Sequence, residues 1–361
     1  MTAISADRIL TAAGWLDKAE VSLADGRIER IESVSRPVAF SYLAPGFIDI
    51  QVNGFDSIDL ATSSPDTWPA LALGLVSRGV TSWLPTLISR PLDAYAAWLE
   101  DVRVFAGGVH GPRVLGVHLE GPWLGGLVGA HVDVAKGSID VEWCRSLSST
   151  VRIVTLGPER PGAIEAIEYL CNRGIIVAAG HSNANRRAAQ RAFDAGVSLL
   201  THCFNATTPI HQREPGLTGL ALVRDDVYIS LIADGQHVHP DILKIAVRAK
   251  GPERTILVSD SSGWAAGALG ATKIQLIDGA PRKSDGGLAG SALTLDAAIR
   301  YMVNNEVLRL DDALRCTSTV PAQLLGASEI GVIRIGAEAD LVALDDNLQV
   351  VAVWVSGKQI V

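Results

Sequence analysis

Eight short apolar segments divide the middle of this chain at regular intervals, and they restrict its possible folds more than any other feature. The segments are residues 47–51, 80–85, 114–120, 151–156, 175–181, 198–202, 228–234 and 255–260. They begin about 23 to 37 residues apart, which is the spacing of strand–helix units in a parallel sheet. Eight such units close most economically into a (β/α)8 barrel, so we predict an α/β chain with this barrel.

Helical patterns fill the intervals between these segments. Clear examples are residues 162–174, 186–196 and 240–251, and two of them end in a basic residue near a glycine, as helix C-termini do. An open, doubly wound parallel sheet is the competing fold. It gains no support, because no GxGxxG follows the first predicted strand.

The two ends of the chain differ from the middle, since both are patterned as short strands. Alternating apolar residues surround the turn signal Asp25-Gly26, and similar hairpin signals recur near the C-terminus. We therefore expect residues 1–45 and 325–361 to form one small β domain, with residues 46–324 as the barrel. Independent hairpins at each end are the alternative.

Composition favours a globular enzyme that acts on a small molecule. Of the 361 residues, 48% are hydrophobic and 19% charged, and the net charge is −8. This charge argues against a nucleic-acid partner or an anionic membrane. No apolar run approaches the roughly 18 residues of a membrane span, and no signal peptide is evident. The four scattered cysteines lack a CxxC motif, so we expect reduced thiols in a cytoplasmic protein.

Five of the predicted strands end in a side chain that can ionise or bind a metal. These residues are Gln51, Glu120, His181, His202 and Asp260. Barrel enzymes build their active sites at the carboxyl ends of the strands. Buried carboxylates and imidazoles at such positions need partners, such as a metal or one another. Any one of them could instead be a core histidine or a helix cap, but coincidence explains the whole set poorly.

Three of these residues form a plausible metal-binding set. Glu120, His181 and His202 offer one oxygen and two nitrogens, which suits a catalytic metal with an open position. We expect Zn²⁺, with Fe²⁺, Co²⁺ or Mn²⁺ as alternatives. Asp260 would face the same centre and serve as general base, then as general acid. His118 shares the strand parity of Glu120, so it either supports the metal ligands or is a buried structural histidine.

Ten short motifs follow one another along most of the chain. They are APGFIDIQVNG (44–54), GVHLEGPWL (116–124), GAH (129–131), GHSNA (180–184), THCFNAT (201–207), REPG (213–216), ADGQHVHP (233–240), LVSD (257–260), LAGSALTLDAA (288–298) and GVIRIGAEADLVALD (331–345). In this order they resemble the N-acetylglucosamine-6-phosphate deacetylase family of the amidohydrolase superfamily. The resemblance implies a barrel with a small β-sandwich made of both chain ends. It also implies metal-dependent hydrolysis of N-acetylglucosamine 6-phosphate to glucosamine 6-phosphate and acetate.

The resemblance assigns roles to individual residues. It implies that Glu120, His181 and His202 hold the metal. Asp260 would be the acid and base, and His237 would polarise the substrate carbonyl. The implied substrate contacts are Ala130, His131, Asn205, Ala206, His237 and the backbone of Leu288, Ala289 and Gly290. Arg213 would reach in from the neighbouring subunit to bind the phosphate of the substrate. This role implies a homodimer and fits the preference of arginine for phosphate.

The sequence departs from many related amidohydrolases where a second metal would bind. The first predicted strand ends in Gln51-Val52-Asn53 instead of His-x-His, and the fourth, at 151–159, contains no lysine. We therefore expect one metal per subunit. The alternative is a weak second site that uses the Gln51 oxygen, and Gln51, Asn53 and His118 could otherwise support the first site.

Three loops are atypical for the family, and they leave the substrate open. These loops follow Asn53, Glu120 and Asp260. One alternative is therefore a deacetylase of another N-acyl amino sugar, such as N-acetylgalactosamine 6-phosphate. The other is a non-catalytic protein with the amidohydrolase fold that serves in assembly or as a sensor.

Overall fold

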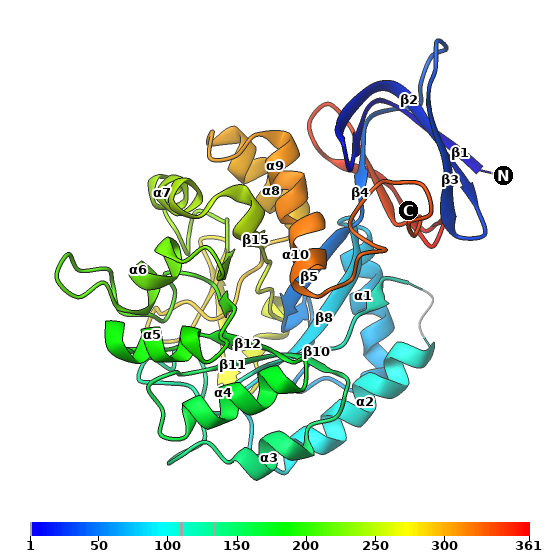
Figure 1. The fold of residues 1–361 in the computed structure, drawn as a ribbon. Helices are drawn as coiled ribbons and strands as arrows, with labels where there is room; N and C mark the ends of the chain where they lie inside the picture. The colour runs from blue at the N-terminus through cyan, green and yellow to red at the C-terminus, as the bar shows by residue number, and fades with distance from the viewer. Residues whose placement is uncertain (1, 109–110, 133) are drawn as a thin grey trace.

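A ring of parallel strands forms the centre of the computed structural model, which describes residues 2–108, 111–132 and 134–361 (Figure 1). In spatial order the strands are β5 (Phe47–Val52), β8 (Val80–Ile88), β10 (Val117–Glu120), β11 (Val151–Leu156), β12 (Ile176–Ala179), β13 (Leu199–Leu200), β14 (Tyr228–Leu231) and β15 (Thr255–Leu257). β15 and β5 meet where Val52 bridges Ser261 and the Asp260 amide donates to the Gln51 carbonyl at 3.0 Å. The predicted (β/α)8 barrel is confirmed.

Four of the strands, β12, β13, β14 and β15, stop two or three residues earlier than the sequence pattern predicts. β12, β13 and β15 end before His181, His202 and Asp260, which we expected at the strand ends. Each of these residues has a left-handed backbone, with φ of 48°, 27° and 48°. A strand cannot continue through such a conformation, so the chain turns there and its next side chains leave the ladder.

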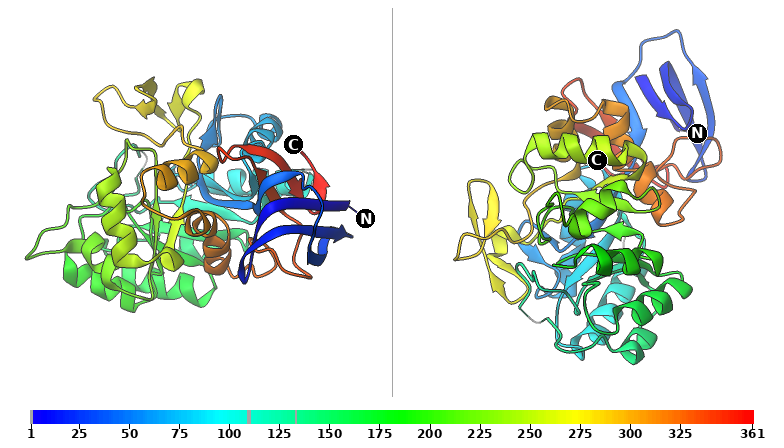
Figure 2. Two further views of the ribbon diagram at one scale, coloured as in Figure 1. Left: turned by 90° about the horizontal axis from the view of Figure 1, so that it is seen from above. Right: turned by 60° about the vertical axis from the view of Figure 1, so that its left-hand side comes forward.

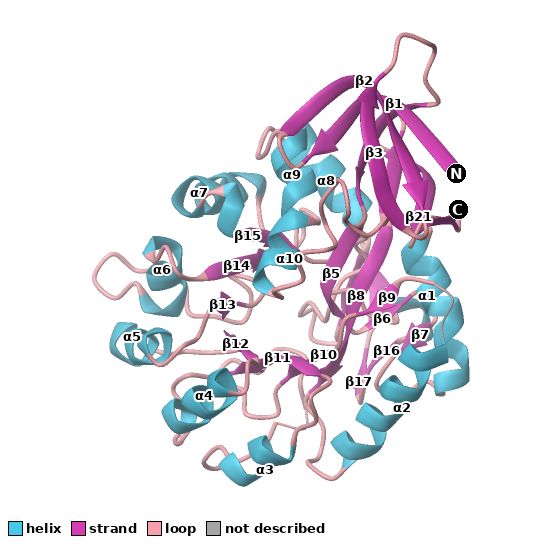
Figure 3. Cartoon of the chain, turned by 45° about the vertical axis from the view of Figure 1, so that its right-hand side comes forward, coloured by secondary structure: helices cyan, strands magenta, loops and turns pink. Residues whose placement is uncertain are grey.

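Helices pack around the outside of the ring (Figure 3). They are α1 (Trp68–Val76), α2 (Ala94–Gly108), α3 (Val141–Ser146), α4 (Ala163–Asn172), α5 (Arg186–Asp194), α6 (Gly216–Val223), α7 (Pro240–Lys250), α8 (Leu295–Asn304), α9 (Leu310–Cys316) and α10 (Thr319–Leu324). The three helices exemplified from the sequence are confirmed as α4, α5 and α7. In α4, Ala163, Ile167 and Leu170 form the buried stripe expected of an amphipathic helix. No helix in the described ranges has both the length and the apolar character needed to cross a membrane.

The strands near the two chain ends pair into one mixed sheet. Its order is β22 (Lys358–Gln359), β21 (Val350–Val355), β20 (Leu341–Leu344), β4 (Phe40–Pro45), β1 (Thr2–Thr11), β2 (Gly14–Ala24) and β3 (Arg27–Ser33). The predicted hairpin at Asp25-Gly26 joins β2 and β3. Val21 and Ile28, near one edge, share a buried core with Leu341 and Trp354, near the other. The expected sandwich is therefore a single sheet that bends over its own core.

A projection between β15 and α8, which we call the flap (residues 264–290), stands out from the barrel (yellow in Figure 2). It contains two hairpins, β16 (Ala268–Leu269) with β17 (Thr272–Lys273) and β18 (Gln275–Ile277) with β19 (Ala280–Arg282). The other short elements are β6 (Gly54–Phe55), β7 (Ile58–Asp59), β9 (Arg113–Val114) and 3₁₀ helices at Pro65–Thr67, Pro252–Arg254 and Trp264–Ala266. The Gly270 amide donates to the Asp59 carboxylate at 3.0 Å, which ties the flap to the loop after β5.

Candidate active site

A cavity of about 510 Å³ lies at the carboxyl end of the barrel strands, within the range of about 300–1,000 Å³ typical of small-molecule sites. Its walls come from the loops that follow the strands and from the flap. The predicted site residues that line it are Asn53, Glu120, Ala130, His131, His181, His202, Asn205, Ala206, His237, Asp260, Leu288, Ala289 and Gly290. The fold thus brings into one cavity residues that are far apart in the sequence.

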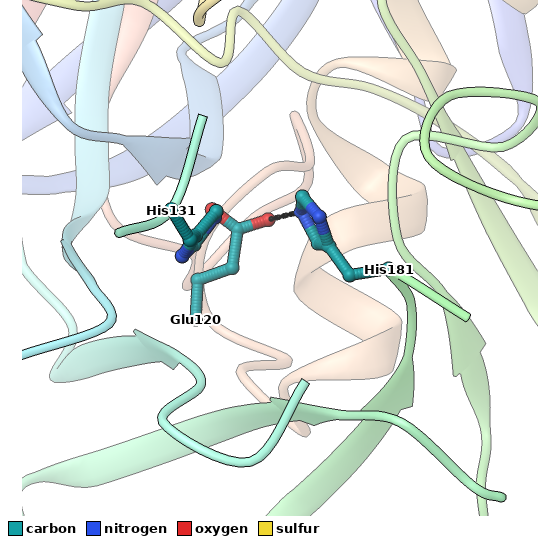
Figure 4. Close-up of side chains that lie close together, drawn as sticks. All are labelled: Glu120, His131 and His181. Atoms are coloured by element: carbon teal, nitrogen blue, oxygen red, sulfur yellow. Dashed lines mark hydrogen bonds and ion pairs between the residues drawn. The ribbon is translucent and has the colours of Figure 1, made fainter. Parts of the chain in front are cut away.

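The Glu120 carboxylate is the centre of a buried polar cluster (Figure 4). Its Oε1 lies 2.9 Å from His202 Nε2 and 3.3 Å from His181 Nε2. Its Oε2 lies 3.5 Å from His131 Nε2. Figure 4 shows His131 and His181 on opposite sides of the carboxylate. All four side chains are buried, so these contacts are shielded from solvent.

Burial and hydrogen bonding act against each other in this cluster. Burial alone would raise the pKa of Glu120, but its contacts with His131, His181 and His202 hold that pKa well below its usual range. Burial lowers the pKa of His181 to about 4, so this ring is neutral near pH 7. Burial opposes protonation of His202 too, but the hydrogen bond with Glu120 raises its pKa. The cluster therefore contains an ionised carboxylate beside at least one neutral imidazole, the forms that bind metals.

The chemistry and spacing of these donors fit a divalent cation. His181 Nε2 and His202 Nε2 lie 3.1 Å apart, and both face Glu120 Oε1. Ligand atoms of Glu120, His131 and His181 also lie within 4.8 Å of one another. Imidazole nitrogens combined with a carboxylate oxygen suit Zn²⁺ and related first-row metals. The cluster is therefore consistent with the divalent-metal site of amidohydrolases.

Gln51 orients the Glu120 carboxylate. Its Nε2 donates to Glu120 Oε1 at 3.0 Å, and its Oε1 accepts a hydrogen bond from Thr201 Oγ1 at 2.9 Å. Both polar atoms of the amide are therefore engaged, including the oxygen that a weak second metal site would use. This arrangement favours a supporting role for Gln51.

Asp260 lines the same cavity and is held by Asn53. The Asn53 Nδ2 donates to Asp260 Oδ1 at 2.7 Å. Burial is the main cause that raises the pKa of Asp260, and the charge of Glu120 raises it further. His202, His237 and the Asn53 hydrogen bond act in the opposite direction. A carboxyl group with a raised pKa is suited to accept and return a proton near neutral pH.

Close backbone packing fixes the position of His181. A Cβ at Gly180 would lie 2.2 Å from Thr201 Cγ2, so no larger residue fits there without a shift. A Cβ at Gly129 would lie 3.2 Å from His181 Cε1. The His181 Nδ1 also lies 3.1 Å from the Leu127 carbonyl oxygen. This contact favours a proton on Nδ1. The unprotonated Nε2 then faces the cluster and can bind a metal.

His131 has a place in the site that the sequence did not reveal. The family resemblance assigned it to the sugar, but its ring also contacts Glu120 and packs 4.5 Å from the His181 ring, centroid to centroid. Its Nδ1 accepts a hydrogen bond from the Ser89 amide at 3.1 Å. The only signal in the sequence was the tripeptide GAH, and no periodicity marks a loop residue.

His237 lines the same cavity from the loop after β14. Its Nδ1 lies 2.7 Å from Asp234 Oδ2, and its backbone amide donates to Asp234 Oδ1 at 2.8 Å. Both contacts fix the ring against the loop. His237 is therefore held firmly in the cavity wall, with its ring orientation set by one carboxylate.

His118 lies inside the barrel and makes no hydrogen bond to Glu120 in the described structure. Its Nδ1 is 3.0 Å from the Ile50 carbonyl oxygen, and its Nε2 is 2.8 Å from Thr155 Oγ1. Burial lowers the pKa of His118 to about 4. Both ring nitrogens have partners on neighbouring strands, so His118 acts as a buried structural histidine that links strands inside the barrel.

Arg213 does not line the cavity within the described chain. It lies on an exposed loop between β13 and α6, where its amide donates to His211 Nδ1 at 3.3 Å. The cavity does contain a cation that the sequence did not single out, Lys283 of the flap. Lys283 therefore lines the cavity of its own subunit, whereas Arg213 does not.

Comparisons with known proteins agree with this geometry. Residues 42–360 match the model of the amidohydrolase family. The chain is 36% identical over 373 residues to the N-acetylgalactosamine-6-phosphate deacetylase of Escherichia coli O157:H7, covering 98% of both chains. It is 37% identical over 353 residues to the human N-acetylglucosamine-6-phosphate deacetylase, covering 91% of this chain and 86% of that one. A solved mutant of N-acetyl-D-glucosamine-6-phosphate deacetylase from Mycobacterium smegmatis, in complex with N-acetyl-D-glucosamine-6-phosphate, matches with a TM-score of 0.91 and 30% identity, covering 100% of this chain and 99% of that chain.

Proposed function

The chain belongs to the amidohydrolase family, and on that premise we propose that it removes the acetyl group from N-acetylglucosamine 6-phosphate. The observation that carries the proposal is the meeting of Glu120, His181 and His202 with Asp260 in one cavity. N-acetylgalactosamine 6-phosphate is the second candidate substrate. The relative with that name is 36% identical over nearly the whole of both chains, which supports it equally.

We propose that Glu120, His181 and His202 hold one divalent metal, with Zn²⁺ as the first choice and Fe²⁺, Co²⁺ or Mn²⁺ as alternatives. When bound, such a metal lowers the pKa of water and polarises an amide carbonyl. Gln51 keeps the Glu120 carboxylate aligned with the histidines through its 3.0 Å hydrogen bond. This support is of the kind that typically changes metal affinity about 10–100-fold when removed.

Asp260 moves the proton in the proposed reaction. As the oxygen of the attacking water bonds to the acetyl carbon, Asp260 takes a proton from that water. It then delivers the proton to the amide nitrogen as the carbon–nitrogen bond breaks, giving the free amine and acetic acid, which ionises to acetate. Asn53 holds the carboxylate in place through Oδ1, which leaves Oδ2 for the transfer.

The substrate carbonyl oxygen gains negative charge in this step and needs hydrogen-bond donors. His237 is the donor that the family resemblance assigns, and its contact with Asp234 at 2.7 Å fixes its ring. His131 is a second candidate for the same oxygen, because its Nε2 lies 3.5 Å from Glu120 Oε2. We propose that both rings face the acyl group of the substrate.

The sugar would occupy the remaining cavity. Its proposed contacts are Ala130, His131, Asn205, Ala206, Leu288, Ala289 and Gly290, all of which line the cavity. We also propose a homodimer in which Arg213 reaches the phosphate in the neighbouring site, since the residue lies outside the cavity of its own chain. The four cysteines are free thiols, which supports a cytoplasmic location.

Acetate release is the direct test. Purified protein would be assayed with both N-acetylhexosamine 6-phosphates before chelation, after chelation, and after Zn²⁺ is added back. We expect chelator-sensitive release that zinc restores, and the ratio of kcat/KM values identifies the preferred epimer. Folded, zinc-loaded protein that releases acetate from neither sugar would overturn the proposal, and release that survives complete metal removal would overturn its metal dependence.

A further inference from the structure

Lys283 is the cation of the flap that reaches the cavity. It follows β19 directly, and it lines the cavity together with Gly287 and residues 288–290 of the same segment. The loop 126–131, which follows β10, also lines the cavity, and its Gly129 carbonyl oxygen contacts Lys283. Lys283 therefore stands where the flap and this loop meet.

Hydrogen bonds and close packing hold the Lys283 amine at this junction. Its Nζ donates to the Gly129 carbonyl oxygen at 3.3 Å and to Asp285 Oδ2 at 3.1 Å. A Cβ at Gly287 would lie 3.0 Å from Lys283 Cε, so the side chain rests against glycine backbone. The side chain is only 25% exposed. An ammonium group has three donors, so one remains for a ligand in the cavity.

Gly129 links the amine to the metal-binding end of the cavity. A Cβ on this glycine would lie 3.2 Å from His181 Cε1. One residue thus contacts Lys283 through its carbonyl oxygen and packs against a proposed metal ligand on another side. Only Gly129 therefore lies between the Lys283 amine and His181, a proposed ligand of the metal beside which we place the acetyl group.

The charges around the cavity indicate what Lys283 would bind. Among the residues that line it in the described chain, Lys283 is the only lysine or arginine. The neighbouring Arg282 is directed elsewhere, because its guanidinium donates to the Gly286 carbonyl and to Gln236. Asp285, the carboxylate partner of Lys283, is 66% exposed and can turn to solvent. A phosphate entering the cavity meets this one cation from its own subunit.

We propose that Lys283 binds the phosphate group of the substrate from within the same subunit. This inference rests on the proposed function, because it assigns the phosphate of that substrate. It adds a recognition residue to the Arg213 expected from the partner subunit. It also extends the part that the flap plays in the substrate site, because Lys283 then joins residues 288–290, which we place against the sugar.

The test compares variants with phosphorylated and unphosphorylated N-acetyl sugars. Lys283→Met keeps the aliphatic stem and removes the charge, whereas Lys283→Arg keeps the charge. Lys273→Met is the matched control, since Lys273 is an exposed lysine of the same flap that does not line the cavity. We expect Lys283→Met to raise KM for the 6-phosphate about tenfold, with kcat within about twofold. The KM of Lys283→Met for the unphosphorylated sugar should stay close to the wild-type value. Lys283→Arg and Lys273→Met should keep KM values for both sugars close to those of the wild type.

An equal rise in KM for both sugars would show that Lys283 only latches the flap to Gly129, and it would overturn the inference. So would an unchanged KM for the 6-phosphate. Calorimetric titration of the zinc-loaded protein with inorganic phosphate separates this inference from the proposed function. Weaker phosphate binding by Lys283→Met but not by Lys273→Met supports the subsite even if the wild type releases no acetate. Equal phosphate affinity of all three proteins contradicts it.

Discussion

The side-chain amide of Asn53 donates a hydrogen bond to Asp260 Oδ1 at 2.7 Å, although the two residues are 207 positions apart. Asn53 follows β5 and Asp260 follows β15, the first and last strands of the barrel. The bridge between Val52 and Ser261 joins the same two segments. The contact that completes the ring therefore also places the proposed acid and base.

Asp260→Asn should lower kcat about 10²–10⁴-fold, because the amide cannot carry the proton. The amide has the shape of the carboxylate and can still accept the Asn53 hydrogen bond, so the metal content should match wild type. Steady-state kinetics and metal analysis of the same preparation check both expectations. Turnover near the wild-type rate would remove Asp260 from its role.

Gln51→Ala should weaken metal binding about 10–100-fold, because Glu120 loses the hydrogen bond that orients it. Competition against a chromophoric chelator measures the affinity. Asn53→Ala is the matched control: it removes a neighbouring amide whose hydrogen bond goes to Asp260, so it should lower kcat and leave metal affinity intact. The same loss of affinity in both variants would contradict a specific link between Gln51 and Glu120.

Gly180→Ala should destabilise the protein by about 1–3 kcal/mol through overpacking. The new methyl group would meet Thr201 Cγ2 at 2.2 Å and Thr155 Cγ2 at 3.1 Å. Thr201→Ser removes the first of these methyl groups and keeps the hydroxyl that Gln51 accepts from. The double variant should therefore recover part of the lost free energy of unfolding, which urea unfolding measures. Additive effects of the two substitutions would argue against this contact.

Asp49→Asn should change how stability depends on pH. Burial raises the pKa of Asp49 from 3.8 to about 7 in the folded chain. A raised carboxyl pKa favours folding below pH 4, and this contribution is lost as the pH rises to 7. Relative to the variant, the wild type should lose about 2–4 kcal/mol between pH 4 and pH 8. Denaturant unfolding across this range tests it, and parallel stability curves would contradict it.

Mixing Asp260→Asn subunits, which lack the proton carrier, with Arg213→Ala subunits, which would bind the phosphate weakly, should restore turnover at low substrate concentration if Arg213 acts across a dimer. A subunit with Arg213→Ala keeps Asp260 and receives Arg213 from an Asp260→Asn partner, so one site in each mixed dimer is complete. Random reassortment should give about a quarter of the wild-type sites. Acetate release after denaturation and refolding together, against each variant refolded alone, measures this. No recovery in a confirmed mixed dimer would place Arg213 outside the partner's site.

Much of the candidate site was predictable because its signals are local or periodic. Strand-length apolar runs at regular spacing predicted the barrel, and the position of Glu120, His181 and His202 at the ends of such runs predicted that their side chains would meet. Helix α4 was visible for the same reason, since burial of Ile167 and Leu170 follows helical spacing. These patterns reflect which face of each element is buried, and that choice is encoded residue by residue.

Other features depend on contacts between distant segments, and the sequence did not show them. β12, β13 and β15 end shortly before residues with a left-handed backbone, a conformation that no pattern of apolar residues reveals. His131 and Lys283 lie on loops, and their positions beside Glu120 and Gly129 depend on where those loops are docked. His118 shares strand parity with Glu120, but its hydrogen bonds to Ile50 and Thr155 come from neighbouring strands.

The sequence by itself thus determined the barrel, the terminal β strands and the residue types available at the strand ends. Periodic burial is a property of each element alone, so it can be read before the elements are assembled. Tertiary structure decided which of those side chains touch, which carboxylate is ionised and which cation faces the cavity. These outcomes depend on distances and burial that arise only when the ring closes and the flap packs against it.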